Sequence, residues 1–349
     1  MPLLQRVPHL THRQRRSLAA VAATLVVVVV VVANQPSASS AANPQARPAA
    51  ARAIEGGGVT NVVTPLPTPL PVLKLIHTRI AFSDDTAAHP GAPKVDAVAG
   101  ILLDADTGSI LWARDPHTAR PPASTTKVLS TMVALDNLDP DQVVTISDDA
   151  LHQAGDETVM GLKPGNRLTV RELLDGMLTV SANDAATALA ADTVGTAAFV
   201  NAMNQQVSAL GLRDSHFVTP VGLDDPQQLA SPYDLAAIAA VDADRFPLFR
   251  QIVSQTEIDL PASAQHPEFD LVNLNRLLKI YPAADGIKPG YTGDAGACLI
   301  GMAERDGHRL ISVLMNAKQL YTDSRALLDW GFVQEGLPSL LPTPSPAKR

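Results

Sequence analysis

The spacing of apolar residues divides the chain into strand-like ends and a helical middle. Apolar runs at Ala99–Leu103 and Ser109–Ala113 predict two strands, joined through a turn at Asp104–Gly108 as a hairpin. Strand-like runs return late in the chain, at Ala297–Ala303 and Leu310–Met315. The first and last parts of the domain are therefore both predicted to supply strands.

Between these strands, residues from about 141 to 262 show mainly helical spacing. Helices are predicted over Thr169–Thr179, Asp184–Ala191 and Thr196–Leu210, and Leu327–Phe332 is predicted to be part of a closing helix. Strands from both ends with helices between them predict an α+β fold. In this fold an antiparallel sheet is flanked by helices, with a helical subdomain inserted in the middle. The cleft between sheet and subdomain is the expected functional site.

The N-terminus carries the features of an export signal. Arg13, Arg15 and Arg16 precede an apolar run from Leu18 to Ala33, and a basic region followed by a hydrophobic region directs export. Residues 1–33 are predicted to be a signal peptide or an N-terminal membrane anchor. The run of about 16 residues is short for a membrane span of roughly 20 and long for a signal peptide, so both alternatives stay open.

Composition predicts the remaining boundaries. Residues 34–94 are rich in Ala, Pro, Ser and Thr, which indicates an extended Pro/Ala-rich linker. The predicted catalytic domain spans 95–335, and the proline-containing tail 336–349 is predicted to be flexible.

Charge and histidine spacing argue against some classes of function. The chain of 349 residues has a net charge of −8, which argues against a nucleic-acid partner. Its nine histidines are scattered without metal-ligand spacing, so no metal or other cofactor is predicted. The single cysteine, Cys298, lies in an apolar run and is expected to be buried.

The segment from Ser124 to Lys127 carries the first candidate chemistry. It opens a stretch of helical spacing, so the two side chains are expected on one face, nearly one turn apart. A serine hydroxyl needs a base within hydrogen-bond reach to act as a nucleophile. A lysine amine can be that base when burial or a neighbouring cation disfavours its charged form. Taken alone, such a serine is more often a helix N-cap.

Two further polar segments stand in mostly apolar surroundings. In Ser181–Asp184, between two predicted helices, Ser181 is a candidate proton shuttle and Asn183 a partner for a lysine or a substrate amide. A helix cap is the alternative. In Asp285–Thr292, glycines would let a strand approach a substrate, and Lys288 would be a second cation that attracts a carboxylate. The alternative there is a glycine-rich turn with a solvated lysine.

In this order, the three segments resemble the Ser-x-x-Lys, Ser-x-Asn and Lys-Thr-Gly signatures of penicillin-recognising serine enzymes. The resemblance covers roughly residues 95 to 335 and is to the low-molecular-mass penicillin-binding proteins, the D-alanyl-D-alanine carboxypeptidases. It is carried by Pro121–Lys127, Leu173–Ala186, Met203-Asn204, Gly211–Phe217, Gly222-Leu223, Asn275–Leu278 and Asp285-Gly286. The resemblance implies the β-lactamase/transpeptidase-like form of the α+β fold.

The resemblance also implies catalytic roles. Ser124 would attack the carbonyl between the two terminal D-alanines of a peptidoglycan stem peptide, and Lys127 would take its proton. Ser181 and Lys288 would help to carry a proton to the leaving D-alanine. Water would then hydrolyse the ester. β-Lactam antibiotics would mimic the substrate and leave Ser124 acylated.

The substrate-binding residues implied by the resemblance are Asn183, Lys288, Gly290 and Tyr291. The backbone N–H groups of Ser124 and Tyr291 would form an oxyanion hole, in which one donor contributes about 2.7–4 kcal/mol. The implied partners are peptidoglycan stem peptides, β-lactam inhibitors and, through the N-terminal segment, the membrane.

The third signature departs from the family pattern, because Pro289 stands between Lys288 and Gly290 where the family has threonine. In the family that hydroxyl helps to hold the terminal carboxylate of the substrate, and proline has neither a hydroxyl nor an N–H. The lost hydrogen bond to a charged group costs about 1.5–3 kcal/mol. Proline also predicts an edge strand. The family often has an arginine after its last strand, for which Lys318 and Arg325 are the candidates here.

The leading prediction is an exported serine-type D-Ala-D-Ala carboxypeptidase that trims peptidoglycan. Because the third signature is Lys-Pro-Gly, a peptidoglycan endopeptidase or a catalytically weak peptidoglycan-binding relative is the alternative. A β-lactamase is disfavoured, since the sequence shows no obvious counterpart of the deacylating glutamate of class A enzymes.

Overall fold

The computed structural model describes residues 91–154 and 158–342. The predicted signal or anchor (1–33), nearly all of the predicted linker (34–94) and the end of the tail (343–349) lie outside the described residues. Among the residues that are described, none of the helices has the length and hydropathy needed to cross a membrane. The predicted domain boundaries therefore stay predictions.

A five-stranded antiparallel sheet joins the two ends of the domain. Its strands follow the order β2 (Ile110–Arg114), β1 (Ala97–Asp104), β9 (His308–Ala317), β8 (Gly296–Arg305) and β7 (Ala284–Thr292). The predicted hairpin and the two predicted late strands are all present. Apolar spacing alone did not predict β7, because its nine residues include two glycines and a proline.

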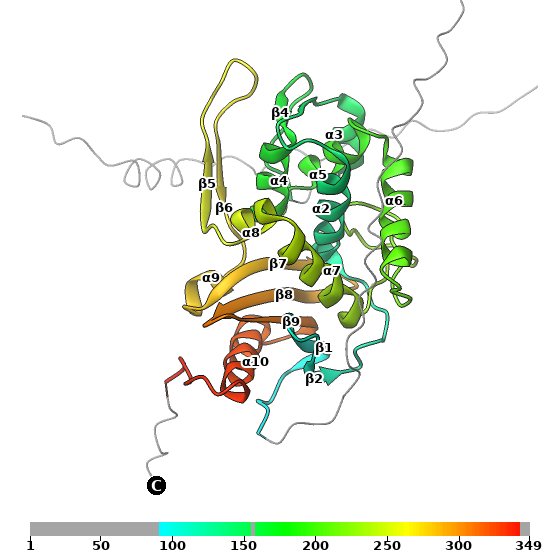
Figure 1. Cartoon of the computed structure of the whole chain (residues 1–349). Coiled ribbons are helices and arrows are strands. Elements are labelled where there is room, and N and C mark those ends of the chain that lie inside the picture. The colour runs from blue at the N-terminus through cyan, green and yellow to red at the C-terminus, as the bar shows by residue number, and fades with distance from the viewer. Residues whose placement is uncertain (1–90, 155–157, 343–349) are drawn as a thin grey trace, which may run out of the picture. The chain divides into compact units, whose positions relative to one another are not determined.

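Several helices form a layer on one face of this sheet, and one long helix near the C-terminus covers the other face (Figure 1). The helices of the described residues are α2 (Thr126–Asn137), α3 (Asp148–Ala154), α4 (Val170–Thr179), α5 (Asn183–Ala191), α6 (Thr196–Ala209), α7 (Pro232–Arg245), α8 (Pro247–Val253), α9 (Leu277–Ile280) and α10 (Leu320–Gln334). The three predicted middle helices are α4, α5 and α6, and the predicted closing helix is the longer α10. The start of α4 is fixed by a capping box between Thr169 and Glu172.

The stretch from 141 to 262 is mainly helical, as predicted, with α3 to α8, but it also contains three short strands that the pattern does not predict. β3 (Val143–Thr145) pairs with β4 (Arg167–Thr169), and β5 (Glu257–Leu260) pairs with β6 (Phe269–Val272). Three or four residues are too few to show a period. In addition, β3 and β4, which pair with each other, lie far apart in the sequence. The β5–β6 hairpin stands beside the helical layer (Figure 1).

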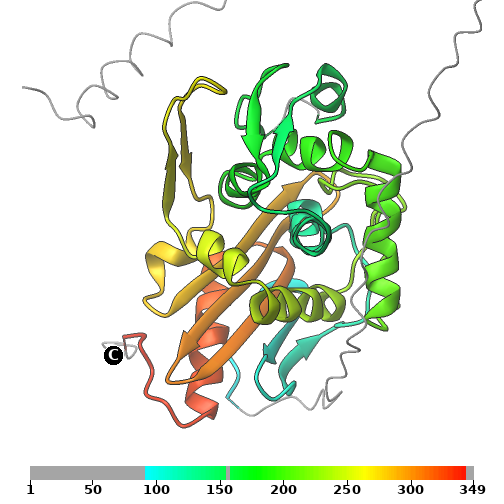
Figure 2. The same ribbon diagram turned by 45° about the horizontal axis from the view of Figure 1, so that its top comes forward.

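The two faces of the sheet contribute to different hydrophobic cores. Successive residues of a strand point to opposite faces, so Ile101 and Leu103 pack in the core shared with α2 and α7, whereas Leu102 packs under α10. Cys298, on β8, is fully buried, as predicted. Figure 2 shows α10 behind the sheet and α7 in front of it.

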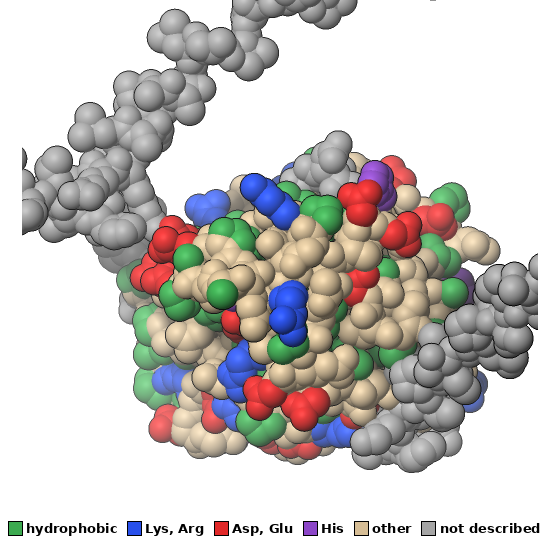
Figure 3. All heavy atoms as spheres, turned by 90° about the horizontal axis from the view of Figure 1, so that it is seen from above, with side chains coloured by type: hydrophobic (Ala, Val, Ile, Leu, Met, Phe, Trp, Pro, Cys, Tyr) green, Lys and Arg blue, Asp and Glu red, His purple; other side chains and the backbone are tan. Residues whose placement is uncertain are grey.

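The face seen from above carries side chains of both charges. Basic, acidic and hydrophobic side chains are interspersed on it, with polar groups between them (Figure 3). Neither sign of charge dominates the described residues on this face.

Candidate active site

Ser124 and Lys127 meet at the start of α2, on the face that the sequence predicts. Ser124 lies in a short 3-10 turn, η1 (Ala123–Thr125), that leads into α2. The Nζ of Lys127 donates a hydrogen bond to Ser124 Oγ at 2.9 Å. The alternative that Ser124 is a helix cap is wrong, because Thr125 occupies the N-cap position of α2, without a capping side-chain bond.

The amine of Lys127 is held by oxygens from three parts of the chain. Its side chain is fully buried. Besides Ser124 Oγ, its Nζ donates to Asn183 Oδ1 at 2.8 Å and to the carbonyl of Val221 at 3.0 Å. Asn183 is therefore the partner of a lysine, one of its two predicted roles, and its contact with a substrate amide stays a prediction. Sequence reasoning missed Val221, since a backbone carbonyl leaves no signal in a motif.

The backbone beside the nucleophile is tightly constrained. Ala123 has a φ of 50°, a conformation that residues other than glycine rarely adopt. Gly222 has a φ of 87°, and a Cβ on it would stand 2.0 Å from the Ala123 carbonyl oxygen. Only glycine fits at position 222. This position directly follows Val221, whose carbonyl accepts a hydrogen bond from Lys127. Strained backbone of this kind is concentrated at functional sites.

Ser181 reaches the same pocket from the link between α4 and α5, with a φ of 63°. Ala182 holds the N-cap position of α5, so the alternative of Ser181 as a helix cap is wrong. The neighbouring loop is held by the Asp184 carboxylate, which accepts the N–H groups of residues 160–162. The Asn183 N–H also donates to the Thr158 carbonyl at 2.6 Å. These bonds hold the segment that directly follows Ser181.

Strand β7 forms the opposite side of the site. It lies at the edge of the sheet, as Pro289 predicts. A Cβ on Gly290 would stand 2.8 Å from the Ser124 nitrogen, so glycine allows this strand to touch the nucleophile's turn. Tyr291 follows and is 73% exposed. Ser124 and Tyr291 both line the cavity, and the oxyanion hole predicted from their N–H groups stays a prediction.

Lys288 is fully buried, and its Nζ donates to the Pro289 carbonyl at 3.1 Å. The alternative of a solvated lysine in a loose turn is therefore wrong. Burial lowers the pKa of Lys288 to about 7. Lys288 is not among the residues that line the pocket. Its predicted contacts with Lys127 and with a substrate carboxylate stay predictions.

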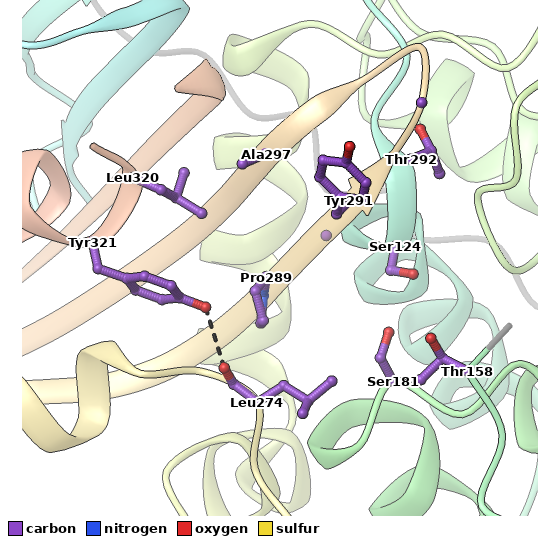
Figure 4. A pocket seen from close by; sticks show the side chains of 12 residues that line it. Ser124, Thr158, Ser181, Leu274, Pro289, Tyr291, Thr292, Ala297, Leu320 and Tyr321 are labelled. Atoms are coloured by element: carbon purple, nitrogen blue, oxygen red, sulfur yellow. Dashed lines mark hydrogen bonds between the residues drawn. The ribbon is translucent and has the colours of Figure 1, made fainter. Parts of the chain in front are cut away.

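Residues from all three predicted segments line a cavity of about 590 Å³. Figure 4 shows Ser124, Ser181 and Thr158 together on one side and Leu320 and Tyr321 on the other. The lining residues are Ser124, Thr158, Ser181, Leu274, Pro289, Gly290, Tyr291, Thr292, Gly293, Ala297, Leu320 and Tyr321. None of these described lining residues carries a charged side chain. Lys318 and Arg325, the candidates for the family's arginine, are not among them.

The model of one protein family, described as D-alanyl-D-alanine carboxypeptidase (Peptidase_S11), matches residues 85–319. The chain belongs to this family. It is 40% identical over 248 residues to the D-alanyl-D-alanine carboxypeptidase DacB2 of Mycobacterium tuberculosis, covering 69% of this chain and 84% of that protein. It is 33% identical over 272 residues to DacF of Bacillus subtilis, covering 75% of this chain and 69% of that protein.

Solved structures of this family have the same fold. A D-alanyl-D-alanine carboxypeptidase from Mycobacterium tuberculosis H37Rv superposes with a TM-score of 0.66 at 36% identity, over 71% of this chain and 95% of that chain. The Streptomyces K15 DD-transpeptidase gives a TM-score of 0.65 at 29% identity, over 69% of this chain and 99% of that chain. The predicted family, fold class and enzyme class are confirmed, and the endopeptidase and binding-protein alternatives are not favoured.

Three side chains that could bind a cation lie apart from the carboxypeptidase site. The ligand atoms of Asp104, His308 and Glu335 lie within 4.8 Å of one another. None of the three lines the pocket. The Oδ1 of Asp104 already accepts the N–H groups of Asp106 and Thr107 at 2.9 and 3.1 Å, so this carboxylate stabilises the turn after β1. The chemistry at Ser124 uses none of these groups.

Replacing Lys288 with methionine is expected to change how stability depends on pH. The unfolded lysine keeps its proton up to about pH 10.5, whereas the folded one releases it near pH 7. Between these values the unfolded state binds more protons, so Lys288 makes the free energy of unfolding rise by up to about 1.4 kcal/mol per pH unit. Urea unfolding of both proteins at pH 7, 8 and 9 measures this.

The free energy of unfolding of the variant minus that of the wild type is expected to fall as the pH rises from 7 to 9, because only the wild type contains Lys288. All other titrating groups are common to both proteins and cancel. A difference that stays constant over this range would mean that folded Lys288 keeps its proton.

Proposed function

We propose that this protein removes the terminal D-alanine from peptidoglycan stem peptides by way of an ester on Ser124. The observation that carries the proposal is the 2.9 Å contact between Lys127 Nζ and Ser124 Oγ, inside a cavity that Ser181 also lines. A serine with a base in hydrogen-bond contact and a second hydroxyl in the same cavity is typical of an acyl-transfer enzyme. The family assignment supports the D-Ala-D-Ala bond as the substrate.

In the first step, Ser124 Oγ forms a bond to the carbonyl carbon between the two D-alanines. Its proton passes to Lys127 Nζ, which must be neutral for this step: its two N–H groups then donate to Asn183 Oδ1 and the Val221 carbonyl, and its lone pair accepts the Ser124 hydroxyl. The carbonyl oxygen becomes an oxyanion, and the N–H groups of Ser124 and Tyr291 stabilise it. The carbon–nitrogen bond then breaks, and the proton held by Lys127 passes by way of the Ser181 hydroxyl to the departing amine, which leaves Lys127 neutral again. The product of this step is an ester on Ser124 and free D-alanine.

In the second step, water attacks the ester carbonyl, and Lys127 accepts a proton from the water. The bond between the carbonyl carbon and Ser124 Oγ then breaks, Lys127 returns the proton to Oγ, and the shortened peptide is released as a carboxylic acid. β-Lactams contain an amide in the same position relative to a carboxylate, so they acylate Ser124 in the same way. Peptidoglycan peptides and β-lactams are thus the expected partners of this pocket.

The export predicted from the N-terminal sequence agrees with this function. The basic and apolar segment at residues 1–33 would direct the enzyme across the membrane, and the linker at 34–94 would carry the domain away from the membrane surface. Peptidoglycan is outside the cytoplasm, so we place the enzyme on the wall side of the membrane, secreted or N-terminally anchored. Fractionation of cells expressing the full chain tests this placement, and a cytoplasmic enzyme would contradict it.

The activity is tested with purified protein and the tripeptide diacetyl-L-lysyl-D-alanyl-D-alanine. Release of D-alanine is expected, and no release is expected from the peptide that ends in L-alanine. Absence of D-alanine release, or equal cleavage of the two stereoisomers, would contradict the proposed function.

Replacing Pro289 with threonine is expected to increase activity. Threonine supplies a hydroxyl beside Gly290, on the wall of the pocket, where a terminal carboxylate can accept a hydrogen bond. Such a bond to a charged group is worth about 1.5–3 kcal/mol, so kcat/KM for the tripeptide is expected to rise about 10- to 100-fold. The matched control is Pro289→Val, which has the shape of threonine without its hydroxyl. Equal rates for the two variants would rule out the hydroxyl as the missing group.

A further inference from the structure

One side of the pocket is built from apolar groups, which we call the apolar wall. Its members are Leu274, Pro289, Ala297, Leu320 and Tyr321. They come from three separate parts of the chain: the segment after β6, the β7–β8 pair and the start of α10. Figure 4 shows them on the side of the cavity away from Thr158 and Thr292.

The apolar wall starts beside Ser181. The N–H of Leu274 donates to the carbonyl of Thr179 at 3.0 Å, only two residues before Ser181. In Figure 4 the Leu274 side chain points toward Ser181. In the proposed function, Ser181 delivers the proton to the departing amine. The residue that carries this amine therefore lies along the apolar wall.

Contacts between its members hold the apolar wall in place. The hydroxyl of Tyr321 donates to the carbonyl of Leu274 at 3.2 Å, and the guanidinium of Arg276 lies 5.6 Å from the centre of the Tyr321 ring. Leu320 is largely buried, whereas Leu274 remains 47% exposed. The apolar wall is a fixed surface with apolar area still open to a ligand.

No described residue lining the cavity carries a charge, and Lys288 is not among the lining residues. Pro289 has no hydroxyl, so its side chain offers a carboxylate no hydrogen bond. A methyl group, as in D-alanine, would cover little of the apolar wall. A longer apolar side chain would cover more of it, and burial of apolar area favours binding.

We propose that the apolar wall is the subsite for the side chain of the leaving residue, and that it selects D-amino acids with medium-sized apolar side chains, such as D-leucine, over D-alanine. This inference rests on the proposed function. Recognition of the leaving residue would thus depend on its side chain more than on its carboxylate.

The experiment compares three tripeptides that differ only in the last residue: D-alanine, D-leucine and D-asparagine. D-Asparagine has nearly the shape of D-leucine but is polar. Partial burial of three extra carbons is expected to raise kcat/KM for D-leucine about 5- to 10-fold above D-alanine. D-Asparagine is expected to be no better than D-alanine.

Leu274→Ala tests the apolar wall itself. It is expected to remove most of the D-leucine advantage, measured within each protein as the ratio of kcat/KM for the D-leucine peptide to kcat/KM for the D-alanine peptide. Val272→Ala is the matched control, because Val272 lies two residues away, is 43% exposed and does not line the cavity. It is expected to leave the D-leucine advantage intact.

The outcomes separate the inference from the proposed function. If D-alanine is cleaved as well as D-leucine, or D-asparagine as well as D-leucine, the inference is wrong and the proposed function stands. An unchanged D-leucine advantage in Leu274→Ala would also overturn the inference. If none of the three peptides is hydrolysed, the proposed function fails and the inference falls with it.

Discussion

Replacing Ser124 with alanine is expected to abolish acylation by penicillin and to lower D-alanine release by at least about 10⁴-fold. Ser124 Oγ is the atom that forms the ester, so no other group in the cavity can substitute for it at a useful rate. Removal of the nucleophile in serine hydrolases has effects of this order. Labelling with a fluorescent penicillin, followed by denaturing electrophoresis, measures the acylation.

The variant is expected to fold normally. Ser124 is only partly buried, and its recorded side-chain bond is the one with Lys127, so the expected loss of stability is about 1 kcal/mol. Ser254→Ala is a matched control, since Ser254 ends α8 and lies outside the pocket. A covalent penicillin adduct on the Ser124→Ala protein would show that another residue is the nucleophile.

Replacing Lys127 with methionine is expected to lower the acylation rate about 10²- to 10⁴-fold, the usual contribution of a positioned general base. Methionine fills the buried space but accepts no proton. Solvent hydroxide then has to act as the base, so the residual rate is expected to rise about tenfold per pH unit. Stopped-flow measurement of penicillin acylation between pH 7 and 9 gives both quantities.

Stability needs a separate measurement in this variant. Asn183 Oδ1 and the Val221 carbonyl lose a donor, and each such loss costs about 1–3 kcal/mol. Thermal unfolding reports this cost, and the pH slope of the residual rate identifies the loss of a base. Lys163→Met, at an exposed position, is the control. Acylation of Lys127→Met at the wild-type rate would assign the base to another group.

The short-range part of this site could be predicted from the sequence. The spacing of Ser124 and Lys127 determines that they share a face, whether the first turn is 3-10 or α. The sheet built from both ends was likewise visible in its apolar runs. Strand β7 was expected only from the resemblance to the family, because glycine and proline interrupt its apolar pattern.

The long-range part could not be predicted. The Val221 carbonyl is 94 residues from Lys127, and a backbone oxygen has no sequence signature. The apolar wall unites Leu274 with Leu320 and Tyr321 through packing alone, and apolar residues near strands and helices are normally assigned to the core. Burial of Lys288 was also unexpected, since an isolated lysine in a glycine-rich segment is usually solvated.

Peptide mapping of the penicillin adduct tests the central claim most directly. Wild-type protein is incubated with benzylpenicillin, digested and analysed by mass spectrometry. The account predicts one penicillin per protein molecule, attached to Ser124. An adduct located on Ser181 or any other residue, or a protein that stays unmodified, would contradict it.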